Sequence, residues 1–181
     1  MPTRTSTRTI RPGLRRAAVS VVALLALASG CANAEPSVVA YVGPTRISQG
    51  ELDDAVAGVT STLQEGQQVS KEAVVNVLIH GVLAEQIAAA NNLTVTDSER
   101  ETLLKGSELA GLLDVPAARP VAFDIADQQI VASKVGPEAY LKAVGEKSVT
   151  LNPRYGVLDP TQKLIVTDQS GSLAKPVPPT P

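Results

Sequence analysis

The sequence is poor in the residue types from which most reactive sites are built. Its 181 residues include one cysteine, Cys31, and one histidine, His80, which excludes an internal disulfide, a cysteine-based metal site and a pair of catalytic histidines. Tryptophan is absent and aromatic residues make up 2% of the chain, so bases and sugars would find almost no stacking surface. Motifs for a phosphate loop, a nucleophile elbow or a metal-ligand cluster are also missing. We therefore expect no catalytic residue, no metal, no cofactor and no enzyme activity.

Basic residues are concentrated at the start of the chain. The formal net charge is −2, from 16 Lys and Arg against 18 Asp and Glu. Residues 1–30 hold five arginines and no acid, which leaves 11 basic against 18 acidic residues, a formal −7, in residues 31–181. Nucleic-acid binding needs clustered Lys and Arg, so the acidic body is not expected to bind DNA or RNA.

Residues 1–30 have the order of a secretory signal peptide, which is basic, then apolar, then small. The apolar run from Ala17 to Ser29 has 13 residues, whereas about 20 are needed to cross a membrane. Its end, Leu27-Ala28-Ser29-Gly30-Cys31, resembles a bacterial lipobox in which the leucine lies one place further from the cysteine than usual. We expect Cys31 to carry lipid, palmitate included, and to anchor the protein to the outer, extracytoplasmic face of the cell membrane.

Two questions about export stay open. A plain signal peptide could be cleaved near Ala32-Asn33-Ala34, which would leave Cys31 incidental. Arg15-Arg16 is compatible with a twin-arginine signal, although Ala17-Ala18-Val19 stands where that motif usually has a bulky apolar pair. The sequence therefore does not decide between the general secretory and the twin-arginine route.

The remaining chain divides into a tether, one domain and a tail. Residues 31–37 form the tether, and the proline-rich residues 170–181 are expected to be disordered. Residues 38–169 contain no internal repeat and no long linker, which indicates one domain. Its patterns predict an α+β fold that is mainly α with a small β element, ordered as a short strand, four or five helices and a C-terminal hairpin.

The elements of this domain are separated by recognisable caps and breaks. A strand is expected at 38–42, and three helices are expected to begin after the N-caps Ser48, Ser70 and Thr96, the last in a capping box with Glu99. The other expected elements are helices at 107–113, 121–135 and 138–144 and strands at 149–151, 155–158 and 164–167.

The helix from Ser70 to about Ala90 should be the most buried element. Its apolar positions cover more than half of its circumference, a pattern that is typical of a helix surrounded by other elements. At its centre we expect Leu78, Ile79, Val82 and Leu83.

Three segments occur in an order that is typical of a known family. The opening strand leads into Ile47-Ser48-Gln49-Gly50-Glu51-Leu52-Asp53, the long helix ends at Asn91-Asn92-Leu93-Thr94-Val95-Thr96-Asp97-Ser98-Glu99, and Asn152-Pro153-Arg154-Tyr155-Gly156 follows late in the chain. Over roughly residues 38–160 these segments resemble the SurA-like N-terminal domain of periplasmic chaperones and foldases, as carried by small actinobacterial lipoproteins.

The resemblance implies a fold and a function. It implies that the first strand pairs with a strand near the C-terminus, and that the domain binds unfolded or translocated polypeptides. Many members also carry a parvulin isomerase domain, for which this chain has no room. His80 and Phe123 alone also fall short of the paired histidines and aromatic residues of that active site.

Each remaining polar group has a structural interpretation. His80 shares a helix face with Asn76 and Glu72, and is expected at the surface or its boundary. Arg154-Tyr155 is expected at a hairpin edge, and the sequon Asn92-Leu93-Thr94 would be accidental in a bacterial lipoprotein. The acids of two helix first turns are favoured there by the helix dipole, namely Glu51, Asp53, Asp54, Asp97, Glu99 and Glu101.

Three functions remain possible for this domain. The first is a membrane-anchored chaperone whose partners are polypeptide clients or envelope proteins, at binding residues that the sequence does not identify. The alternatives are a minimal or degenerate peptidyl-prolyl isomerase and a structural subunit of a cell-envelope complex. The scarcity of methionine and aromatic residues disfavours a broadly promiscuous surface, whereas an exposed apolar patch would favour client binding.

Overall fold

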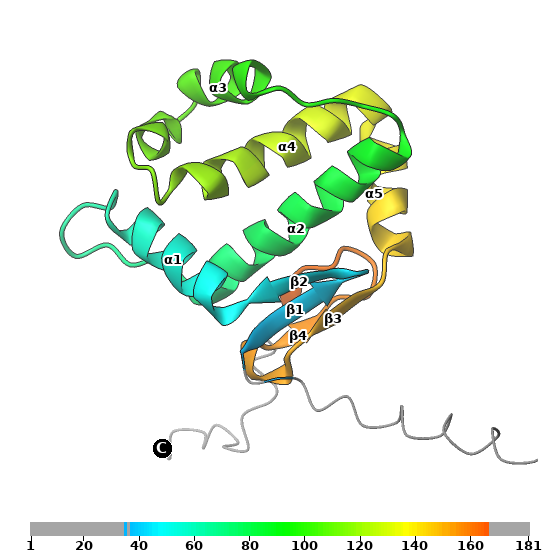
Figure 1. Ribbon diagram of the computed structural model, residues 1–181, viewed down its shortest axis with the longest axis horizontal. Coiled ribbons are helices and arrows are strands. Elements are labelled where there is room, and N and C mark those ends of the chain that lie inside the picture. The colour runs from blue at the N-terminus through cyan, green and yellow to red at the C-terminus, as the bar shows by residue number, and fades with distance from the viewer. Residues whose placement is uncertain (1–34, 36, 167–181) are drawn as a thin grey trace, which may run out of the picture. The chain divides into compact units, whose positions relative to one another are not determined.

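The computed structural model describes residue 35 and residues 37–166, which form five α-helices and a small antiparallel sheet (Figure 1). This architecture confirms the predicted α+β class, mainly α with a small β element. The predicted signal segment 1–30, Cys31 and the predicted tail 170–181 lie outside the described residues, as does most of the predicted tether 31–37.

The sheet has three strands, with the first strand of the chain in the middle. β1 (Val38–Val42) pairs antiparallel with β2 (Thr45–Ser48) on one side and with β3 (Val149–Leu151) on the other. The pairing of β1 with β3 is the N-terminal to C-terminal closure that the family resemblance implies. β2 was not predicted, because its four residues were assigned to the turn and to the approach to the Ser48 cap.

A tight turn joins β1 to β2. Val42 pairs with Thr45, so only Gly43 and Pro44 lie between the strands. Gly43 has a φ of 56°, the positive value that a type II′ turn needs at its first central position, and proline is compatible with the second. The same Gly-Pro pair that ends the first strand therefore also reverses the chain into a second one.

The helices follow the predicted order, with small shifts of their ends. The predicted helix at 107–113 is instead a short 3₁₀ helix, η1, and the predicted strand at 155–158 is shortened by a second one, η2. The helical elements are α1 (Gln49–Thr60), α2 (Lys71–Ala90), α3 (Asp97–Lys105), η1 (Ala110–Asp114), α4 (Arg119–Val135), α5 (Pro137–Glu146) and η2 (Pro153–Tyr155). The hairpin strands are β4 (Val157–Leu158) and β5 (Ile165–Val166).

The three predicted helix caps are confirmed. The Ser48 hydroxyl accepts the Glu51 N–H at 3.2 Å, and the Glu51 carboxylate accepts the Ser48 N–H at 2.7 Å. Thr96 and Glu99 form the same reciprocal box at α3, and Ser70 caps α2 by accepting from Ala73 at 3.3 Å. These bonds satisfy N–H groups that the first helical turn leaves free.

α2 lies between the sheet and α4 (Figure 1). Ile79 and Leu83 are fully buried at its centre, as predicted, whereas Leu78 and Val82 are only partly buried. Those two face the gap between α2 and the start of α4, where cavities reach them from outside. The Gln86 side chain donates to the Val42 carbonyl at 2.9 Å and ties the helix to β1.

Within the described residues, α2 is the one helix long and apolar enough to cross a membrane by length and composition. Its apolar residues pack in the main hydrophobic cluster of the domain, together with β1, α4 and α5. Contact with protein on several sides explains why so much of its circumference is apolar.

Candidate functional site

The acids in the first turn of α1 act on their own helix. Glu51 completes the capping box with Ser48, and Asp53 accepts from the Gln49 side-chain amide at 2.9 Å. Among the described residues no group of three or more His, Cys, Asp or Glu side chains is arranged to hold a metal ion. The helix-dipole interpretation of these acids therefore agrees with their contacts.

The Asn152–Gly156 segment fastens the C-terminal part of the domain to the sheet. The Asn152 side chain and backbone N–H donate to the carbonyls of Val38 and Val39, each at 2.9 Å, where the β1–β2 register shifts. Gly156 has a φ of 119°, and a Cβ there would lie 2.8 Å from the Ile165 side chain, so the position requires glycine. The motif behind the family resemblance thus has a structural role.

Arg154 and Tyr155 of this segment bond to the start of α1. The Arg154 guanidinium donates to Gln49 Oε1 at 2.9 Å, and the Tyr155 hydroxyl bonds to the same oxygen. The guanidinium also lies over the Tyr155 ring, 5.0 Å from its centroid. Arg154 is nevertheless exposed, so these contacts tie an exposed side chain at the start of the hairpin to α1.

His80 lies on the face of α2 that the β4–β5 hairpin covers. Its neighbour on that face, Asn76, accepts the Ile165 N–H at 2.8 Å, which fixes the hairpin to the helix. Burial lowers the pKa of His80, and hydrogen bonding to the backbone of Lys163 and Gln162 partly opposes this. Its buried Nε2 atom has no hydrogen-bond partner among the described residues, and His80 lines neither of the two cavities described below.

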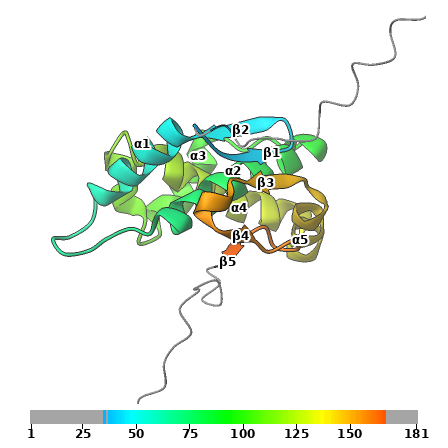
Figure 2. The same cartoon turned by 90° about the horizontal axis from the view of Figure 1, so that it is seen from below.

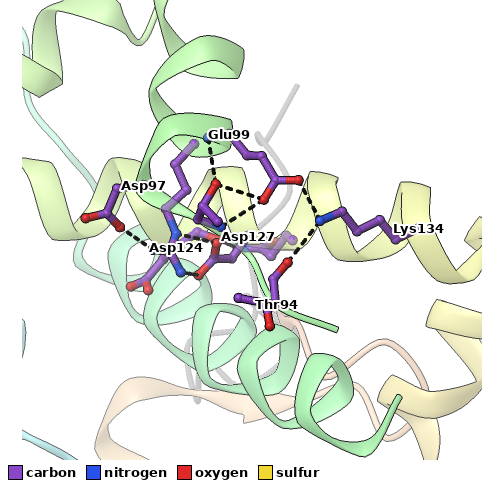
Figure 3. A network of polar contacts seen from close by, with 9 residues as sticks. Thr94, Asp97, Glu99, Asp124, Asp127 and Lys134 are labelled. Carbon is purple, nitrogen blue, oxygen red and sulfur yellow. Dashed lines mark hydrogen bonds and ion pairs between the residues drawn. The ribbon is translucent and has the colours of Figure 1, made fainter. Parts of the chain in front are cut away.

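The acids of α3 join that helix to α4, which the capping interpretation alone did not predict. Lys134 of α4 donates to the Glu99 carboxylate at 2.6 Å and to the Thr94 carbonyl at 3.0 Å (Figure 3). These bonds, with those from Thr96, lower the pKa of Glu99 to about 2. Glu101 in the same way pairs with Arg119 of α4 and with Lys105.

A bidentate ion pair stands at the middle of this helix pair. Arg100 Nε and Nη2 donate to the two carboxylate oxygens of Asp127 at 2.6 and 3.0 Å, and Nη1 donates to Asp97 at 2.6 Å. These acids raise the pKa of Arg100. The guanidinium groups of Arg100 and Arg119 also lie 5.3 and 5.2 Å from the centre of the Phe123 ring, within cation–π range.

Asp124 differs from all these acids because it has no partner. Its carboxyl group makes no hydrogen bond and no ion pair within the described residues, although it is partly buried between α4 and α2. Asp124 lies so close to Gly81 that a Cβ atom added to Gly81 would come within 2.4 Å of the Asp124 Cγ atom. Burial, followed by repulsion from Asp127 and Glu85, raises the pKa of Asp124 to about 7, against an opposing effect of Arg100.

Asp124 also lines two cavities. The first has a volume of about 470 Å³ and lies among α2, α3 and α4, with Glu85, Arg100 and Phe123 in its wall. The second, about 370 Å³, lies among β2, α1, α2 and α4 and is hereafter called the β2 groove. Three residues line both cavities, namely Val82, Pro120 and Asp124, so Asp124 lies at the boundary between them.

The β2 groove has an apolar floor and charged edges. Its apolar lining is contributed by Ile47, Ala55, Leu78, Val82 and Val121. Arg46, Glu51 and Asp54 lie at its edges, with Asp124 at the α4 side. β2 is the outer strand of the sheet on this side (Figure 2), so the groove lies beside an unpaired strand edge.

The unpaired edge offers backbone hydrogen bonds next to the groove. In an antiparallel hairpin with a two-residue turn, hydrogen-bonded and non-hydrogen-bonded pairs alternate outward from the turn. Val42–Thr45 is the first pair and Tyr41–Arg46 the second, so the N–H and carbonyl of Arg46 point away from β1. Sequence reasoning missed this site because neither β2 nor Asp124 stood out as a pattern.

Comparison with known proteins gives no relative for this chain: no family model, no curated protein and no solved structure matches it.

Proposed function

We propose that this chain is a membrane-anchored extracytoplasmic chaperone that holds extended segments of unfolded or translocated polypeptide in the β2 groove. The observation that carries the proposal is the position of an apolar groove directly beside an unpaired strand edge. An extended peptide can add to such an edge through its backbone and place alternate side chains in the groove. Backbone pairing of this kind accepts many sequences, as a holding chaperone requires.

The order of sequence segments that resembles the SurA-like N-terminal domain supports the same function. The lipobox-like end of the N-terminal segment supports attachment to the outer face of the membrane. Neither rests on a matched relative, so each needs its own experiment.

Attachment is tested by Cys31→Ser. Because at least two acyl chains are needed for stable anchoring, removal of the lipidated cysteine should release the protein from the membrane fraction. Fractionation of cells that express the full chain and the variant measures this directly. A variant that stays with the membrane as the parent does would contradict lipid anchoring at Cys31.

Client binding is tested by blocking the strand edge. Arg46→Pro removes the outward N–H, and proline is tolerated at a non-hydrogen-bonded position of an edge strand. Arg46→Gln removes the same charge and keeps the N–H, so it is the matched control. The full chain in lipid nanodiscs is titrated into a fluorescent, reduced and carboxymethylated protein, which serves as a permanently unfolded client.

We expect Arg46→Pro to bind this client roughly 2–10-fold more weakly than Arg46→Gln, the loss that one net hydrogen bond gives. If Arg46→Pro and Arg46→Gln bind the client equally well, the strand edge does not take part in binding. If the parent chain does not bind the client at all, the proposed chaperone function is wrong.

The isomerase alternative finds less support. The resemblance implies paired histidines and aromatic residues around the pocket of an isomerase, whereas His80 is half-buried beside the β4–β5 hairpin and lines neither cavity, and Phe123 lines only the first. The structural-subunit alternative keeps one favourable observation, since Val157, Leu164 and Val166 of that hairpin are exposed apolar residues.

A further inference from the structure

The unpartnered carboxyl group of Asp124 indicates which clients the groove would select. Asp97, Glu99, Glu101 and Asp127, its acidic neighbours in the α3–α4 layer, all have a cationic partner in the described structure. Asp124 alone has none, and it is also the acid that lines both cavities. Because Asp124 is only partly buried and lines both cavities, a client side chain can reach its carboxyl group and supply the counter-ion that the described residues do not.

We propose that the β2 groove selects extended polypeptide segments that place a lysine or arginine side chain at Asp124. The inference rests on the proposed client-binding function and deepens it. A strand added to β2 would lay apolar side chains on Leu78 and Val121 and would direct one long cationic side chain across Val82 toward the carboxylate. Long basic side chains suit this path, because their aliphatic stems bury well while the charge reaches a polar end.

The charges around the groove are complementary to such a segment. Glu51 and Asp54 of α1 lie at its edge, and Glu85 of α2 and Asp127 of α4 lie in the adjoining cavity. The basic groups of the two linings are Arg46 of β2, Arg100 of α3 and Arg119 of α4, and each already lies near an acid.

Those three pairs leave the groove short of positive charge. Arg100 and Arg119 are bonded to Asp127 and Glu101, and the exposed Arg46 lies 3.8 Å from Glu35. A client with a negative side chain would meet unpaired acids without a free cation in the described lining.

Titration of Asp124 supplies a signature that ordinary apolar binding would not give. A cationic client side chain stabilises the ionised carboxyl group, so binding releases its proton. An apolar client removes water from the same group and stabilises its protonated form. The affinity for a basic client should therefore rise with pH, and the affinity for an apolar client should stay level or fall.

The test uses three peptides and the full chain in lipid nanodiscs. Each peptide is acetylated and amidated, alternates threonine and valine, carries a rhodamine label, and has lysine, norleucine or glutamate at its centre. Binding is measured by fluorescence anisotropy at pH 6, 7 and 8. Lysine stays charged throughout this range. His80 lines neither cavity, and any effect of its titration is common to all three peptides.

We expect the lysine peptide to bind about tenfold more tightly at pH 8 than at pH 6, the factor that follows if only the ionised carboxyl group binds it. Asp124→Asn should abolish this pH dependence and the preference for lysine over norleucine. Asp114→Asn, at an exposed acid that lines neither cavity, should leave both unchanged.

The outcomes separate the two proposals. Equal binding of the lysine and norleucine peptides at pH 8 would overturn the selection of basic segments and leave the chaperone function standing. A failure of all three peptides and of the unfolded client would overturn both. If peptide binding weakens as the protein concentration rises, a second copy of the chain competes for the groove. That result would overturn the proposal that the groove selects basic polypeptide segments.

Discussion

The two hydrophobic clusters of the domain are held together in different ways. The larger one joins β1, α2, α4 and α5 through buried aliphatic side chains, and none of its buried members is charged. The smaller one, under α3 and η1, contains Ala122 and Ala126 of α4 and Ala118 just before it, with Leu104 and Leu112. Around it stand the ion pairs of Arg100, Glu101 and Lys134.

The difference follows from how much apolar surface each region offers. Alanine side chains bury little area, so the α3–α4 contact gains less from water exclusion than the contact of α2 with the sheet. Charge-assisted hydrogen bonds add stability and orientation there. Asp124 lies where the two regions meet, and its carboxyl group is satisfied by neither arrangement.

The largest expected effect is a cavity in the larger cluster. Leu83 is fully buried, so Leu83→Ala should lower the free energy of unfolding by about 2–5 kcal/mol. Leu141 is 59% exposed on α5, and Leu141→Ala should change it by less than about 0.5 kcal/mol. Denaturant unfolding measures both variants, and a loss below about 1 kcal/mol for Leu83→Ala would mean that α2 is not the core helix.

The next effect concerns the close contact where the two regions meet. A Cβ on Gly81 would lie 2.4 Å from Asp124 Cγ and 2.7 Å from its Cβ, so Gly81→Ala must push α2 and α4 apart locally. We expect Gly81→Ala to lower the free energy of unfolding by roughly 1–3 kcal/mol, which is typical of overpacking. Gly111→Ala is the control, since no atom lies within 4 Å of the added methyl group, and unfolding curves that coincide for the two variants would exclude the close contact.

The polar region is tested through its most buried ion pair. The Arg100 and Asp127 side chains are 21% and 15% exposed, and Asp127→Ala would leave the guanidinium without its bidentate partner. We expect Asp127→Ala to lower the free energy of unfolding by roughly 1–3 kcal/mol, the cost of leaving a partly buried charged group unsatisfied. Lys105→Ala breaks the exposed pair with Glu101 and should cost at most about 0.5 kcal/mol. Thermal unfolding measures both variants. Equal losses of stability for Asp127→Ala and Lys105→Ala would show that the more buried ion pair contributes no more than the exposed one.

The smallest effect is a pH dependence at the boundary of the two regions. The Asp124 carboxyl group has a pKa of about 7 in the folded chain, against 3.8 for an ordinary Asp. Between those values the folded state holds more protons than the unfolded state, so the stability due to this group falls as pH rises from about 4 to 7.

Asp124→Asn should remove this fall. The full shift would correspond to about 4 kcal/mol. Because Asp124 is only partly buried and lines two cavities, solvent screens much of this, and we expect the variant to gain on the order of 1–2 kcal/mol over the parent between pH 4 and 8. Denaturant unfolding at several pH values measures the difference. A difference between variant and parent that does not change with pH would show that Asp124 does not titrate in this range.

Local patterns in the sequence were enough to place most elements. Ser48, Ser70 and the Thr96–Glu99 pair each mark a helix start, because a capping side chain bonds to N–H groups within three residues of itself. The span of α2 followed from its apolar positions, and β1 from five consecutive apolar residues. The lipobox-like segment is likewise a local pattern, and Cys31 remains a prediction.

Only tertiary structure made the candidate site. β2 is four residues long and becomes a strand because Gly43-Pro44 turns it back onto β1. Asp124 looked like any acid on an amphipathic helix, and it became unusual because Gly81 of α2 lets that helix approach so closely. Contacts between residues 43 positions apart, such as this one, leave no trace in local spacing. The caps and periods that mark elements therefore cannot reveal which side chains end up without a partner.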